Sequence, residues 1–228
     1  MIKSSAYTVS YNKLQRILKR YNHLNSSLNT QGVFSDEFKR ACIEKKYFEA
    51  YDVGINNLDY DFLLNDASFF QFSRSEKSGA VTLRYAYYPN PIDTISYIDY
   101  LTEHDFTFEE CGEELKEQYE MDMSNASQKS DFNVIRYDYS EKEYSEGIHS
   151  VSHFHIGFKK SVSIPISKVL LPETFVNFIL KSCFYTDWKE KISSDSVCKR
   201  EYFSHKKSLK ILKKRHWGEL DKSELFIV

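Results

Sequence analysis

The chain has 228 residues, of which 41% are hydrophobic and 28% charged, a composition that excludes an intrinsically disordered protein. Its formal net charge of -2 excludes a general electrostatic attraction to nucleic acid or to anionic membranes. Because glycine (7) and proline (4) are scarce, we expect a single domain over residues 1–228 rather than modules joined by flexible linkers.

The four cysteines are far apart and form no CxxC pair, which excludes a zinc ribbon and does not suggest a disulfide framework. Residues 1–11 contain no apolar core of a signal peptide, and no apolar run approaches the length of a membrane span. The sequence therefore predicts a cytoplasmic protein with reduced thiols and no membrane partner.

Residues 1–60 are expected to be mainly helical. Apolar residues recur every three or four positions over residues 8–29, which predicts a first helix. Ser35, followed by two acids, predicts the N-cap of a second helix that continues to about residue 51. Residues 55–66 are polar and irregular and are expected to form a loop with room for one short strand.

Residues 61–166 are expected to form a mainly β core with an inserted acidic helix. Residues 68–74 and 80–88 predict a β-hairpin, because a glycine-containing turn separates two β-rich runs. Further strands are predicted over residues 131–139 and 150–158, and an edge strand over 161–166, where Pro165 is tolerated. Between the hairpin and these strands, helices are expected over 93–103, capped by Asp93 or Thr94, and over 109–123.

Residues 167–228 are expected to be helical and basic. A helical apolar stripe begins at Pro172 and continues after a break over 185–192. Residues 199–217 carry eight Lys and Arg against one Glu, and 225–228 predict a short final strand. The predicted fold class is α+β: a central antiparallel sheet of four to five strands, with N-terminal and C-terminal helices packed on one face.

Residues 149–158 hold three of the seven histidines of the chain. Alternate residues of a strand point to the same face, so Phe154, Ile156 and Phe158 share the buried face of the predicted strand. His153 and His155 share the opposite face. The same alternation places Val81, Leu83, Tyr85, Tyr87, Ile135 and Tyr137 on the buried face.

The opposite face collects polar residues from neighbouring strands. Arg84 is contributed by residues 80–88, and Arg136 and Asp138 by residues 131–139. If residues 131–139 pair with residues 150–158, these side chains lie within reach of the two histidines. A solvated sheet face is the simplest interpretation, but such faces are more often filled with Lys, Glu, Thr and Ser.

Three interpretations of this face remain open. In the first, His153 and His155 act as catalytic general base and acid, Asp138 orients a histidine, and Arg84, Arg136 and Tyr88 bind substrate phosphate. This would be a metal-independent ribonuclease or phosphodiesterase, for which no cofactor is expected. In the second, His153, His155 and Asp138 bind a metal ion, with His149 as a further candidate ligand. In the third, the face recognises a partner without chemistry.

The segments Arg84–Pro91, Arg136-Tyr137-Asp138-Tyr139 and His149–Gly157, followed by Pro165 and Pro172, resemble a bacterial family known as domain of unknown function 2290. The order Arg-Tyr-Asp, long loop and His-x-His over the middle third is also similar to small toxins of prokaryotic toxin–antitoxin pairs. These resemblances imply an antiviral defence context, but they supply no catalytic residues.

The resulting functional hypothesis is a bacterial phage-defence or toxin-associated protein that cleaves RNA or another phosphodiester at the histidine face. The alternative is a non-catalytic accessory subunit that binds a protein partner or nucleic acid in a defence complex. Residues 199–217, the basic tail, are a second candidate surface for RNA, although a charged helix is more often simply exposed to solvent.

Overall fold

The computed structural model describes residues 3–28, 30, 32–92, 97–124, 133–159, 162–207 and 209–223. The predicted caps Asp93 and Thr94 and the predicted final strand over 225–228 lie outside these residues. The chain divides into two compact units, Met1–Pro89 with Asn133–Val228, and Asn90–Phe132. Each is described by itself.

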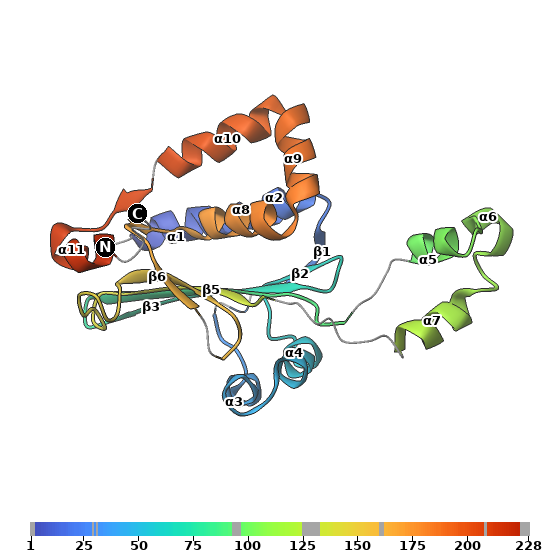
Figure 1. Ribbon diagram of the computed structural model, residues 1–228, viewed down its shortest axis with the longest axis horizontal. Coiled ribbons are helices and arrows are strands. Elements are labelled where there is room, and N and C mark those ends of the chain that lie inside the picture. The colour runs from blue at the N-terminus through green and yellow to red at the C-terminus, as the bar shows by residue number, and fades with distance from the viewer. Residues whose placement is uncertain are drawn as a thin grey trace. The chain divides into compact units, whose positions relative to one another are not determined.

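The larger unit is built around one antiparallel sheet of seven strands in chain order (Figure 1). The strands are β1 (Leu24–Ser27), β2 (Phe62–Leu64), β3 (Phe69–Lys77), β4 (Ala80–Tyr88), β5 (Ile135–Ser140), β6 (Ser152–Ile156) and β7 (Val162–Pro165). The α+β class with a central antiparallel sheet is confirmed, and the predicted count of four to five strands is too low.

The two additional strands lie in segments whose patterns were not β-like. Leu24 fitted the helical apolar spacing, but the helix ends at Arg20, and Asn22 has a positive φ of 56° that turns the chain into β1. The single helix predicted over 8–29 is therefore wrong in its bounds: the segment forms two helices, Ser4–Asn12 and Leu14–Arg20. β2 has only three residues and is the short strand for which residues 55–66 had room.

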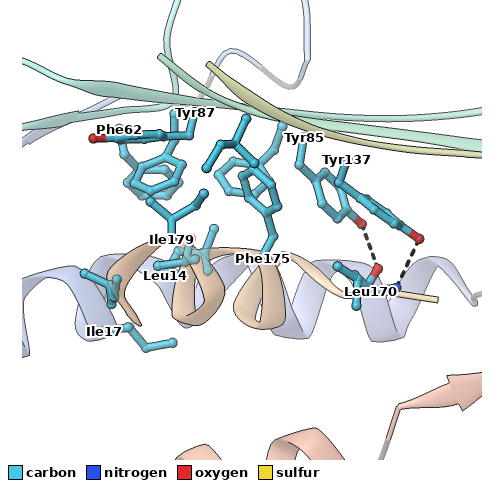
Figure 2. Close-up of a cluster of buried hydrophobic side chains, with 14 of the residues drawn as sticks. Leu14, Ile17, Phe62, Tyr85, Tyr87, Tyr137, Leu170, Phe175 and Ile179 are labelled. Carbon is cyan, nitrogen blue, oxygen red and sulfur yellow. Dashed lines mark hydrogen bonds between the residues drawn. The ribbon is translucent and has the colours of Figure 1, made fainter. Parts of the chain in front are cut away.

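One face of the sheet is the main hydrophobic core, and helices α1 (Ser4–Asn12), α2 (Leu14–Arg20) and α8 (Pro172–Cys183) cover it (Figure 1). Phe175 of α8 is fully buried against the rings of Phe70, Phe72 and Tyr85. Figure 2 shows Tyr85 and Tyr137 reaching across to the main chain of Leu170, where each hydroxyl forms a hydrogen bond. Aromatic rings with buried, paired hydroxyl groups thus fill this layer.

Two further helices, α3 (Asp36–Glu44) and α4 (Tyr47–Asn56), cover part of the other face (Figure 1). The ring of Phe38 on α3 lies 5.6 Å from that of Tyr88, and Gly54 of α4 allows close approach to Phe69. The prediction that the N-terminal and C-terminal helices pack on one face therefore holds for α1, α2 and α8 and is wrong for α3 and α4. The single helix predicted over 35–51 is two helices, and α4 continues to Asn56, into the segment predicted as a loop. The N-cap prediction is confirmed, because Ser35 Oγ accepts from Phe38 N–H at 3.0 Å.

The hairpin β3–β4, the strand β5 and the edge strand β7 are found where the sequence predicted strands. Strand β6 is shorter than the predicted 150–158, because it ends at Ile156 and Gly157 takes a positive φ of 104°, a conformation that favours glycine. The turn places Phe158 against Tyr47 of α4, with ring centroids 5.2 Å apart. Phe158 therefore packs on the second face, and its predicted place beside Phe154 is wrong.

Beyond α8 the chain forms α9 (Tyr185–Ser194), α10 (Ser196–Lys207), β9 (Lys210–Ile211), the short 3-10 helix η1 (Lys214–His216) and α11 (Glu219–Ser223). Strand β9 pairs with β8 (Lys168–Val169), which comes just before α8, in a separate two-stranded sheet. Arg20 of α2 binds Glu201 of α10 at 2.7 Å. An ion pair thus connects the basic tail to the N-terminal helices.

The smaller unit contains α5 (Tyr97–Glu103), α6 (Phe108–Cys111) and α7 (Lys116–Ser124). The rings of Tyr97 and Tyr100 pack against Tyr119, at 4.9 and 5.2 Å between centroids. The helix predicted over 109–123 is broken into α6 and α7. No helix among the residues that the structure describes is both long enough and apolar enough to span a membrane.

Candidate active site

Strand register brings the five polar candidates of the second sheet face together. Arg84 pairs with Asp138, and Asp138 pairs with His153 on the next strand. Two residues away on each strand, Ala86 pairs with Arg136, and Arg136 pairs with His155. Two cross-strand rows over β4, β5 and β6 therefore carry the site, and the methyl group of Ala86 leaves room beside the arginines.

Asp138 is the centre of this cluster. Its Oδ1 accepts a hydrogen bond from Arg84 Nε at 2.9 Å, and its Oδ2 accepts one from Arg136 Nε at 2.8 Å. Burial acts to raise the pKa of Asp138, but the two guanidinium charges, Arg84 and then Arg136, outweigh it and hold the pKa below its usual value. The carboxylate is therefore ionised at neutral pH and fixes both arginine side chains.

The two histidines face each other. His153 Nε2 lies 3.0 Å from His155 Nε2, and His155 Nε2 lies 3.4 Å from Asp138 Oδ2. His153 Nδ1 must donate to the carbonyl oxygen of Ser150, 2.7 Å away, because a carbonyl oxygen only accepts. In neutral His153 the Nε2 lone pair therefore points into the cluster.

Both imidazoles titrate below their ordinary range. Burial lowers the pKa of His153, which is only 2% exposed. Burial, with the neighbouring charge of Arg136, lowers the pKa of His155 to about 4. Both side chains are neutral at pH 7, so they are suited to accept a proton or to act as ligands, and neither starts as a general acid.

A pocket of about 510 Å³ opens between α3 and the sheet. Its lining includes Arg84, Arg136 and Lys39 as cations, and among the described residues that line it there is no carboxylate. Aromatic rings complete its walls: Phe34, Phe38, Tyr88 and Phe158. Both arginines and Tyr88 therefore face one cavity.

Asp138, His153 and His155 lie beside this pocket and do not line it. His155 is directly opposite Arg136, and 19% of its side chain remains exposed. The hydroxyl of Tyr88 hydrogen-bonds to the thiol of Cys42, and burial raises the pKa of that thiol to about 11, which does not suit a nucleophile.

Several contributors were not singled out from the sequence. The carbonyl of Ser150 fixes the tautomer of His153, and the pocket wall comes from α3, for whose position no sequence pattern gave a signal. Gln71 also lines the pocket; its place on the polar face could have been found by extending the strand alternation to β3.

A family described as an uncharacterized conserved protein, DUF2290, matches residues 11–217. The chain belongs to the DUF2290 family. The match includes every strand of the main sheet and all five residues of the polar cluster. Searches of curated proteins and of solved structures find no match to this DUF2290 chain.

Proposed function

We propose that this DUF2290 protein hydrolyses a nucleotide-containing phosphodiester, RNA first of all, on its second sheet face. The observation that carries the proposal is the cationic, aromatic-walled pocket beside the histidine pair. Its volume of about 510 Å³ is in the range of small-molecule sites. Arginine forks suit phosphate oxygens, and aromatic rings suit a base.

In this proposal the arginines bind the phosphate. Because Asp138 takes the Nε–H of both guanidinium groups, their terminal Nη groups are the donors directed to the substrate. The carboxylate holds the two forks in place before substrate arrives, which lowers the entropic cost of binding phosphate.

The histidine pair would activate the attacking water. A neutral imidazole takes a proton from water while the water oxygen forms a bond to phosphorus. The ester P–O bond then breaks, and the leaving oxygen takes that same proton from the imidazolium. One histidine can thus serve first as base and then as acid, so the reaction needs no imidazole that is protonated at the start.

The proposal is tested with a labelled single-stranded RNA and four proteins: wild type, Arg84→Ala, Arg136→Ala and the control Lys19→Ala. Lys19 is exposed on α2, outside the basic tail, and α2 lies on the other side of the sheet. We expect cleavage by wild type and by the control, and a loss of about 100-fold in each pocket variant. Cleavage that persists at full rate in both pocket variants would overturn the proposal.

The same experiment distinguishes catalysis from the non-catalytic alternative. If wild type binds the RNA but leaves it intact, and the arginine variants lose binding, the face is a recognition surface, as expected for an accessory subunit. The defence context and the toxin likeness remain proposals from the sequence resemblance. A phage-plaque assay with and without the arginine variants would test them.

A further inference from the structure

Three side chains of the polar cluster point ligand atoms at one another. The Nε2 atoms of His153 and His155 are 3.0 Å apart, and Asp138 Oδ2 is 3.4 Å from the second of them. One ligand atom from each residue lies within 4.8 Å of the other two. We propose that Asp138, His153 and His155 bind one divalent transition-metal ion, with zinc as the first candidate.

The distances within the cluster suit such an ion. Two nitrogen ligands at the usual zinc bond length and a tetrahedral angle lie about 3.3 Å apart. Two of the separations in the cluster are within a few tenths of an ångström of that value. His155 would bind as the tautomer that leaves Nε2 without its proton.

The surroundings of these residues are those of metal ligands. Histidines that bind metals usually donate their other ring N–H to a carbonyl or carboxylate, and His153 donates Nδ1–H to the Ser150 carbonyl at 2.7 Å. Asp138 is likewise held by two charged hydrogen bonds, from Arg84 and Arg136. Each of these two ligands therefore has its orientation fixed from outside the cluster.

Ligand chemistry narrows the choice of ion. Two imidazoles with one carboxylate favour zinc, iron, cobalt or nickel over magnesium and calcium, which prefer oxygen ligands. Three protein ligands also leave a coordination position for water, as in catalytic zinc sites. As a role in hydrolysis, which rests on the proposed function, the ion would activate water in place of an imidazole.

The net charge of the cluster couples the binding of a metal ion to the binding of phosphate. Two guanidinium groups against one carboxylate leave one net positive charge, which opposes a cation. A phosphate anion between the ion and the arginines would offset this repulsion. The metal and inorganic phosphate should therefore each increase the affinity for the other.

The test is a calorimetric titration of untagged, chelator-treated protein with zinc chloride, alongside cobalt chloride followed by its visible absorption. Wild type should bind one equivalent. His153→Ala, His155→Ala and Asp138→Asn should each lose about 100-fold or more in affinity, while His104→Ala, at an exposed histidine of the smaller unit, should bind like wild type. Circular dichroism checks that each variant folds.

Absence of stoichiometric binding to wild type, or wild-type affinity in all three ligand variants, would overturn the metal site. Inorganic phosphate should tighten zinc binding several-fold in wild type and not in Arg136→Ala; an equal effect in both would overturn the charge argument. Hydrolysis by chelator-treated protein without binding of zinc or cobalt would reject the metal and keep the proposed function. Zinc or cobalt binding without hydrolysis of any phosphodiester would keep the metal site and reject the proposed function.

Discussion

At the scale of single residues, Asp138 determines how the polar cluster is arranged. Its side chain is only 14% exposed, and it is the common partner of two arginines and a histidine on three neighbouring strands. Without this carboxylate, two guanidinium groups would lie close together with no opposite charge between them. The arginines are therefore positioned by an acid, and the acid is kept ionised by the arginines.

Asp138→Asn should consequently destabilise the fold as well as the site. The amide keeps the size of the side chain but removes the charge, and we expect a loss of about 1–3 kcal/mol in the free energy of unfolding. We expect this loss of unfolding free energy to be small for the removal of one partner of an ion pair, because 63% of the Arg84 side chain is exposed to screening solvent. Urea denaturation measures it.

Asp52→Asn, an exposed acid on α4, is the matched control and should leave the urea midpoint unchanged. A wild-type midpoint for Asp138→Asn would show that the two arginines do not depend on this carboxylate.

At the scale of elements, the loop between β5 and β6 is positioned by α11. Asp221 is buried and accepts hydrogen bonds from Tyr144 Oη at 2.9 Å, Gly218 N at 2.9 Å and Ser150 Oγ at 3.3 Å. Ser150 in turn accepts from His153 through its carbonyl. A chain of contacts therefore connects α11 to a histidine of the cluster.

Asp221→Ala should loosen that loop and leave His153 less well oriented. We expect a loss of about 1–3 kcal/mol in unfolding free energy, from half-buried donors left without an acceptor, and a fall in zinc affinity of roughly 10-fold. Ile179→Val, a core change in α8 that should cost about 1 kcal/mol, separates the two effects. If both variants change zinc affinity equally, Asp221 does not position the histidine.

The contact between α8 and α10 predicts a dependence of stability on pH. His205 of α10 lies against Thr174 and Glu173, and burial lowers its pKa, against the opposing effect of the Glu173 carboxylate. The unfolded chain therefore takes up a proton on this histidine at higher pH than the folded protein does. Its contribution to stability is complete above about pH 6.5 and is lost as the pH falls.

The melting temperature should thus fall between pH 7.5 and pH 5.5, and His205→Gln should show a smaller fall than wild type. Some dependence should remain, because His153, His155 and His216 also have lowered pKa values. His104→Gln is the control with wild-type behaviour. An identical fall in His205→Gln would contradict this account of the α8–α10 contact.

At the scale of the whole molecule, local patterns predicted the centre of the sheet well and its surroundings poorly. The alternation along 80–88, along 135–139 and along 152–156 is regular, so the faces of Arg84, Asp138, His153 and His155 could be assigned from sequence. Hairpin β3–β4 was equally clear, because a turn-forming stretch that contains Gly79 separates two β-rich runs. In the structure Ser78 and Gly79 both take positive φ.

What could not be predicted depends on contacts between distant segments. Helix α3 has one apolar side, which could pack on either face of the sheet. Because its sequence does not specify which face it covers, the pocket between α3 and the arginines could not be predicted. Phe158 was misplaced because strand alternation holds only as far as Gly157, whose turn sends the ring to the other face. Burial of His153 likewise comes from the tertiary fold.

We propose that the histidine face of this DUF2290 protein is a catalytic site for phosphodiesters, so hydrolysis should depend on its two histidines. The initial rate of bis(p-nitrophenyl) phosphate hydrolysis, with zinc present, is measured for wild type and for the double variant His153→Ala/His155→Ala. We predict hydrolysis by wild type and a fall of about 100-fold or more in a double variant that remains folded. A double variant that hydrolyses the ester at the wild-type rate, or an inactive wild type, would show that the histidine face is not the catalytic site.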